Sequence, residues 1–144
     1  MEKDLIFETK YWNVILSTDQ RYLGRCYIPL KRKCPNLSGV TDEEWLDFQH
    51  NVVQVLEKKT KKAFGAVMHN WGCLMNDAYQ HPSPDPQVHW HFRPRYDKKI
   101  NFAGAEFEDV SFGNHYIPSS ALGAVEVPEN IKKEIIKAIQ NAKT

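Results

Sequence analysis

The sequence predicts one α+β domain, residues 1–144, in which an antiparallel sheet packs against two helices. Three observations lead to this class. Two β-rich runs flank a polar turn within 11–29, residues 88–93 alternate between apolar and polar, and segments at about 41–63 and 129–142 carry apolar residues at helical spacing. With 144 residues, the chain is long enough for one domain with its own core and too short for two.

The predicted strands lie before and after the first helix. YWNVILSTDQRYLGRCYIP at 11–29 is typical of a hairpin that turns at STDQ, with Gly24 at a bulge or a close approach of backbones. A third strand is expected from Gly65 to Asn76, followed by the Pro-rich loop AYQHPSPDP. Residues 98–127 have no clear periodicity, and we expect only a short strand near Val110.

Both helices have clear start signals. Thr41 and Glu44 have the spacing of a capping box before the first helix, and the lysines of KKTKK at 58–62 lie where the helix dipole favours positive charge. Pro128 suits the first turn of the second helix.

Composition narrows the functional classes. Nineteen basic and eighteen acidic residues give a formal charge of +1, so no overall field attracts nucleic acid or a membrane surface. The three cysteines are scattered without a CxxC pattern, which is typical of reduced thiols in a cytoplasmic protein. No segment resembles a signal peptide or a membrane span. We therefore expect a cytoplasmic protein with no nucleic-acid or membrane partner.

The segment QVHWHFRPRY at 87–96 contains the candidate functional side chains. In a strand, alternate side chains share a face, so His89, His91 and Arg93 would point to one side and the apolar residues between them to the other. Two imidazoles on one face can address the same small ligand. The alternatives are a merely solvated strand face, or a zinc or iron site completed by His81, His115 or Asp85.

This segment resembles the active-site motif of the histidine triad (HIT) family of nucleotide hydrolases and transferases. The family motif is His-φ-His-φ-His-φ-φ, with φ apolar, and is often followed by Pro-Arg, as in RPRY here. Aligning on Pro-Arg places Gln87, His89 and His91 at the three triad positions. The sequence departs from the motif at Gln87, which replaces the first histidine, and at Arg93, which occupies an apolar position.

The resemblance covers about residues 10–97 and implies roles for single residues. His89 would be the nucleophile that forms a nucleotidyl intermediate, and His91 would hydrogen-bond the phosphate. Asn76 and Ser17 would contact the phosphate or ribose. Apart from the resemblance, Ser83 could cover the α-phosphate, although a rigid connector explains the prolines of its loop equally well, and Arg93, on the same strand face as His91, would reach a polyphosphate chain or pair with a surface carboxylate.

Gln87 leaves the level of activity open. An amide can orient the nucleophile through hydrogen bonds, but it cannot become charged and donate a proton. The resemblance also implies a homodimer, a purine nucleotide substrate and no metal or other cofactor in the protein, although Mg²⁺ can accompany a polyphosphate.

Three functional hypotheses follow. The first is an enzyme that cleaves dinucleoside polyphosphates or nucleoside phosphoramidates at the α-phosphate through His89. The second is a nucleotide-binding or sensing protein on the same fold, in which Gln87 weakens or abolishes catalysis. The third is a metal-dependent enzyme that uses His89 and His91.

Overall fold

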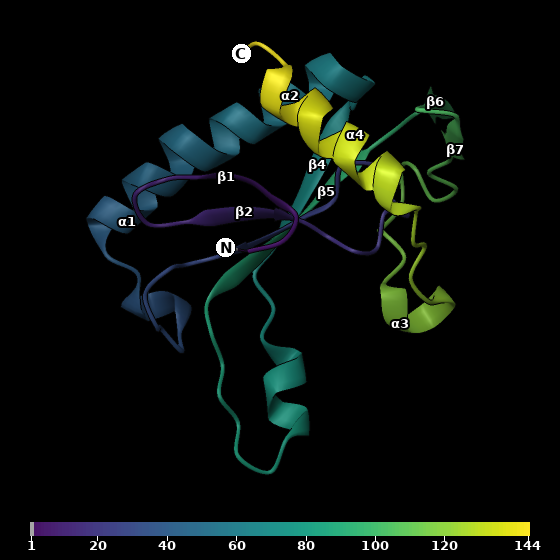
Figure 1. Ribbon diagram of the computed structural model, residues 1–144. Helices are drawn as coiled ribbons and strands as arrows, with labels where there is room; N and C mark the ends of the chain where they lie inside the picture. The colour runs from purple at the N-terminus through teal and green to yellow at the C-terminus, as the bar shows by residue number, and fades with distance from the viewer. Residues whose placement is uncertain (1) are drawn as a thin grey trace.

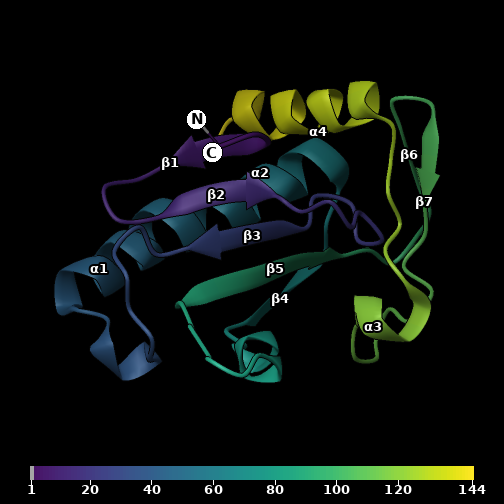
Figure 2. The ribbon, with the colours of Figure 1, turned by 60° about the horizontal axis from the view of Figure 1, so that its bottom comes forward.

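Five antiparallel strands form the central sheet of the protein, in a computed structural model that describes residues 2–144. In spatial order they are β1 (Leu5–Glu8), β2 (Asn13–Leu16), β3 (Cys26–Pro29), β5 (His89–Arg95) and β4 (Met68–Gly72). β5, which holds the two histidines, therefore lies inside the sheet between β3 and β4 (Figure 2). This position fixes the strand from both sides.

A long helix covers one face of the sheet, as the sequence predicts (Figure 1). It consists of α1 (Asp42–Asp47), the π-helical segment η2 (Phe48–Val53) and α2 (Gln54–Phe64), which follow one another without a break. The predicted capping box is confirmed: Thr41 Oγ1 accepts the Glu44 amide at 3.2 Å, and the Thr41 amide donates to Glu44 Oε1 at 2.9 Å.

The second predicted helix is α4 (Glu129–Asn141), which packs against β1 and α2. Lys132 on this helix donates to the Asp4 carboxylate at 2.8 Å, and this ion pair ties the helix to the start of the chain.

The core lies between the sheet and the helices. Apolar residues of β5 and of its neighbours in the sheet point toward the long helix, because alternate side chains of a strand lie on opposite faces. The side chains with no exposed surface include Trp12, Val14, Leu23, Ile28, Val52, Leu56, Val88, Phe92, Ile135 and Ile139.

The structure corrects three sequence expectations. The N-terminal strand β1 was not predicted, because it is only four residues long and ends in a charged side chain. The strand expected at 65–76 ends at Gly72, and Asn76 begins the 3₁₀ helix η3 (Asn76–Gln80). No strand forms at Val110; a hairpin of β6 (Ile100–Phe102) and β7 (Ala105–Phe107) precedes it, and Val110 lies in an exposed turn.

The predicted hairpin is confirmed, with a longer loop than STDQ. β2 and β3 pair antiparallel with Ile15 opposite Tyr27, and the connection spans 17–25. Gly24 in this loop has φ of +86°, and a Cβ there would lie 3.3 Å from the Phe64 ring and 3.5 Å from Pro94. Glycine is therefore required both by the backbone conformation and by the close approach.

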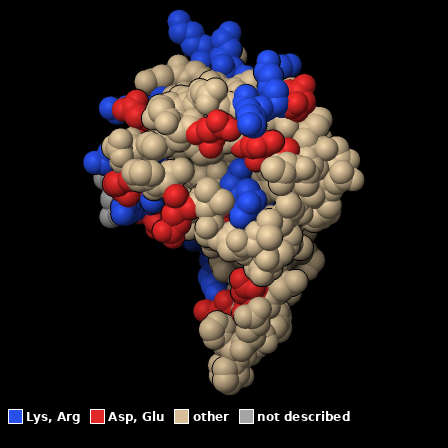
Figure 3. Space-filling model, turned by 90° about the vertical axis from the view of Figure 1, so that its right-hand side faces the viewer, with Lys and Arg blue, Asp and Glu red and all other residues tan. Residues whose placement is uncertain are grey.

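Two short helical elements complete the fold: η1 (Leu37–Gly39) and α3 (Ser119–Leu122). On the surface seen in Figure 3, basic and acidic side chains are interspersed, in keeping with the small net charge. Within residues 2–144, no helix combines the length and the apolar character needed to cross a membrane.

Candidate active site

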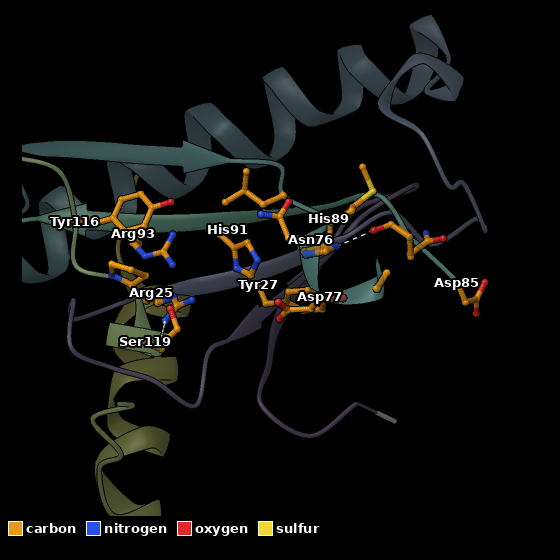
Figure 4. Close-up of a pocket in the computed structure, with 16 residues that line it drawn as sticks. Arg25, Tyr27, Asn76, Asp77, Asp85, His89, His91, Arg93, Tyr116 and Ser119 are labelled. Carbon is orange, nitrogen blue, oxygen red and sulfur yellow. Dashed lines mark hydrogen bonds between the residues drawn. The ribbon is translucent and has the colours of Figure 1, made fainter. Parts of the chain in front are cut away.

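The face of the sheet opposite the long helix carries a cavity of about 530 Å³. β5 and the neighbouring strand β3 supply its floor, η3 and the Pro-rich loop line one end, and Tyr116 and residues 118–120 line the other. Figure 4 shows the two histidines near the middle of this cavity, with Arg25, Arg93, Tyr116 and Ser119 toward one end and Asp85 toward the other.

Strand register explains why these side chains meet. Tyr27 on β3 lies directly opposite His91, and Pro29 lies opposite His89, so Tyr27 shares a face with both histidines. The two imidazole centroids are 4.9 Å apart, and the Tyr27 ring lies 5.0 Å from His89 and 6.0 Å from His91. The predicted convergence of the histidines is therefore present in the fold.

A main-chain hydrogen bond orients His89. Its Nδ1 lies 2.7 Å from the carbonyl oxygen of Gln87. Because a carbonyl oxygen can only accept, Nδ1 must carry the hydrogen, and Nε2 of the neutral ring keeps its lone pair. His89 thus has the tautomer that a nucleophile acting through Nε2 requires.

His91 is a neutral group at ordinary pH. Burial lowers its pKa to about 4, and the nearby His89, Arg25 and Arg93 add to the effect. Its ring nitrogens have no protein hydrogen-bond partner among residues 2–144, so they are available to a ligand in the cavity. A neutral imidazole can donate one N–H to a phosphate oxygen.

The side chain of Gln87 holds a neighbouring loop in place. Its Nε2 donates to the carbonyls of Leu30 at 2.9 Å and Arg32 at 2.7 Å, and its Oε1 accepts the amide of Cys34 at 2.8 Å. The amide group is therefore committed to residues 30–34. The main-chain carbonyl of Gln87, and not its side chain, orients the His89 ring.

The predicted substrate-binding residues divide into two groups. Asn76 and Arg93 line the cavity with the histidines. Ser17 and Ser83 do not: Ser17 lies in the β2–β3 loop, where its hydroxyl accepts the Asp19 amide at 3.3 Å, and Ser83 lines an adjoining depression that shares Asp77, Ala78 and Asp85 with the cavity. The structure thus does not bring these two serines to His89.

The cavity residues that sequence reasoning missed include Arg25, Tyr116 and Ser119. Arg25 immediately precedes β3, and its spacing from Tyr27 could have indicated that the two side chains share a face. The strand register that brings Arg25 near Arg93 cannot be predicted from the sequence. Tyr116 and Ser119 belong to a segment without periodicity.

The hypothesis of a metal site at His89 and His91 requires a third protein ligand. Within residues 2–144, no group of three His, Cys, Asp or Glu side chains converges in a way that could hold a metal ion. Asp85, one of the expected ligands, pairs instead with Lys33 at 2.6 Å. Among the described residues, His89 and His91 therefore have no third protein ligand beside them.

Comparison with known proteins identifies the fold. No protein-family model and no curated protein gives a significant match to the chain. Among solved structures, a Hit-like protein involved in cell-cycle regulation from Bartonella henselae has a TM-score of 0.66 at 19% identity, covering 97% of this chain and 86% of its own. A histidine triad (HIT) protein from Sinorhizobium meliloti has a TM-score of 0.65 at 19% identity, covering 96% and 88%.

A uridylyltransferase is also similar, with a TM-score of 0.63 at 16% identity over 97% of this chain and 41% of its own. The chain therefore has the histidine triad fold, as its sequence motif predicts. His89 and His91 lie on an inner strand of this fold and line the cavity.

Proposed function

We propose that this protein is a histidine triad hydrolase or transferase that cleaves nucleotides at the α-phosphate, with His89 as the nucleophile. The observation that carries the proposal is the hydrogen bond between His89 Nδ1 and the Gln87 carbonyl, which in the neutral ring places the lone pair on Nε2, beside an open cavity. An unprotonated imidazole is a competent nucleophile near neutral pH.

The reaction has two steps. His89 Nε2 forms a bond to the α-phosphorus while the bond from phosphorus to the leaving group breaks, and the leaving group departs with the electron pair. Water or another acceptor then attacks the same phosphorus, and the P–N bond breaks to regenerate the neutral imidazole. The products are a nucleoside monophosphate, or its ester with the acceptor, and the leaving group.

His91 and Asn76 would stabilise the phosphate in both steps. Both line the cavity beside His89, and the unpartnered His91 ring can donate to a phosphate oxygen as charge develops there. We expect His91→Ala to slow nucleotidyl transfer on the order of 100-fold, the effect of losing one such donor. His89→Ala should abolish it, and steady-state rates of the two variants test this difference.

Intact-protein mass spectrometry tests the mechanism directly. Wild type and His89→Ala are mixed with a fluorogenic AMP phosphoramidate or a diadenosine polyphosphate and quenched with acid-free denaturant, while product release is followed in parallel. We expect added AMP on the wild type only, together with turnover. Full activity of His89→Ala would refute the mechanism.

A binding or sensing role without turnover is the second candidate, and one observation favours it. The side-chain amide of Gln87 is fully used by residues 30–34, so no group at the first triad position can protonate a leaving group. Tight AMP binding with neither adduct nor product would support this alternative.

A further inference from the structure

Arg93 is a buried cation without a partner. Its side chain is 5% exposed, yet among residues 2–144 its guanidinium makes no hydrogen bond and no ion pair, and its Nε is buried without an acceptor. The guanidinium lies over the Tyr116 ring, whose centroid is 3.8 Å from Cζ. A ring face holds a guanidinium in place but leaves its N–H groups unsatisfied.

The next arginine on the same face shows what a structural arginine looks like in this protein. Arg95 is 1% exposed and donates to both oxygens of Asp109 at 2.6 and 3.0 Å. It also donates to Asn70 Oδ1 at 2.8 Å and to Ser111 Oγ at 3.1 Å. The fold satisfies one buried arginine completely and leaves its neighbour without any acceptor.

The cavity end around Arg93 is positively charged. Arg25 also lines it and is 9% exposed, but it is held by Asp19 at 2.8 Å and Ser119 at 3.0 Å. Two guanidinium groups and one carboxylate leave one uncompensated positive charge there. Burial lowers the pKa of Arg93 to about 10, so the side chain remains a cation at neutral pH.

We propose that Arg93, supported by Arg25, forms a second anion subsite that receives a phosphate of the leaving group. The natural substrate is then a nucleotide whose α-phosphate is joined to a further phosphate by an anhydride bond. The subsite lies beyond His91 from the nucleophile, because His89, His91 and Arg93 follow one another on one face of β5 at about 6.5–7 Å per step. This inference rests on the proposed function for the identity of the nucleophile.

The chemistry at Gln87 leads to the same substrate class. When His89 attacks the α-phosphorus of an anhydride, the Pα–O bond breaks and the leaving phosphate keeps the electron pair as an anion, without needing a proton. An amine leaving group from a phosphoramidate must be protonated as it departs. This site has no acid at the first triad position and has a free cation for an anionic leaving group, so it favours the anhydride.

Binding of AMP and of α,β-methylene-ADP tests the subsite without relying on catalysis. Titration calorimetry on wild type should show the diphosphate analogue binding on the order of 10-fold or more tightly than AMP, as a charge-assisted contact to a desolvated arginine provides. Arg93→Met, which keeps an apolar side chain against Tyr116, should remove this preference by weakening the diphosphate analogue much more than AMP. Lys98→Met makes the same charge change at an exposed position outside the cavity and should preserve the preference.

The other outcomes separate the two proposals. Equal affinity of wild type for both nucleotides, or an equal loss of both in Arg93→Met, overturns the subsite. A diphosphate preference that depends on Arg93, without any AMP adduct on His89, supports the subsite and overturns the proposed catalysis. Failure of both nucleotides to bind overturns both.

Discussion

Gln87 combines two roles that belong to different parts of the residue. Its carbonyl fixes the His89 ring, while its side chain bonds three main-chain groups of residues 30–34. The sequence predicted that an amide could keep the nucleophile oriented. The orientation is present, but it comes from the main chain, which any residue at this position would provide.

Truncation of Gln87 should therefore affect stability more than nucleophile geometry. Gln87→Ala leaves two carbonyls and one amide without partners, and we expect it to lower the free energy of unfolding by about 2 kcal/mol. Urea unfolding measures this, with Gln49→Ala at an exposed helical position as the control, expected within about 0.5 kcal/mol of wild type. Equal stability of the two variants would contradict this role.

The depressed pKa of His91 links stability to pH. Its pKa is about 4 in the folded protein and 6.5 when unperturbed, so between these values the unfolded chain binds more protons. Stability that His91 contributes above pH 6.5 is therefore lost as pH falls toward 4. We expect His91→Gln to flatten the decline in unfolding free energy between about pH 6.5 and pH 4.5, measured by urea titrations.

Other groups set the background for this measurement. Burial also lowers the pKa of His69, so some slope remains in the variant. The hydrogen-bonded ion pair with Arg32 lowers the pKa of Glu44 from 4.5 to about 2. The stability that this pair contributes is therefore lost only as the pH falls below about 4.5, and the loss is the same in wild type and in His91→Gln. Parallel curves for wild type and His91→Gln above pH 4.5 would show that His91 does not titrate in this way.

At the scale of elements, periodicity predicted β5 and both helices because each buries one regular face. It could not predict what covers the polar face of β5. Arg93 was expected on a face shared with the histidines, and it is buried, together with Arg95, beneath residues 109–119. Residues 109–119 are held over this face by individual long-range contacts, such as that of Arg95 with Asp109. Such contacts produce no periodic pattern in the sequence.

The ion pair between Arg95 and Asp109 should hold this covering segment in place. Asp109→Asn leaves the 1% exposed Arg95 charge without a carboxylate, and we expect a loss of about 3 kcal/mol in unfolding free energy. Amide hydrogen exchange should accelerate across 109–119. Glu108→Gln, an exposed neighbour without an ion pair in the described chain, should change neither quantity. Unchanged exchange in Asp109→Asn would mean that other contacts retain the segment.

For the whole molecule, the sequence predicted the layers but not the strand order. The capping box, the hairpin and the β5 alternation each depend on neighbouring residues, so they could be read directly. The placement of Arg25 opposite the Arg93 position depends on how β3 and β5 align, which no local pattern determines. The proposed anion subsite could therefore be inferred only from the assembled sheet.

Strand order also bears on association. β4 is an edge strand, paired with β5 on one side only, and it begins beside two exposed apolar residues, Val67 at 51% and Met68 at 38%. An unpaired edge with apolar side chains is suited to pairing with another strand. The resemblance to histidine triad proteins implies a homodimer, and we propose that a second copy of the chain docks along β4.

Analytical ultracentrifugation tests this arrangement. We expect wild type to sediment at twice the chain mass of 16.8 kDa and Met68→Lys to sediment as a monomer, because a lysine on the edge opposes strand pairing. Leu122→Lys introduces the same charge on α3, at a residue that is 59% exposed, and should leave the dimer intact. Circular dichroism checks that both variants keep the fold. A wild-type mass of one chain at all concentrations would rule out the β4 dimer, whereas dissociation of both variants would place the interface elsewhere.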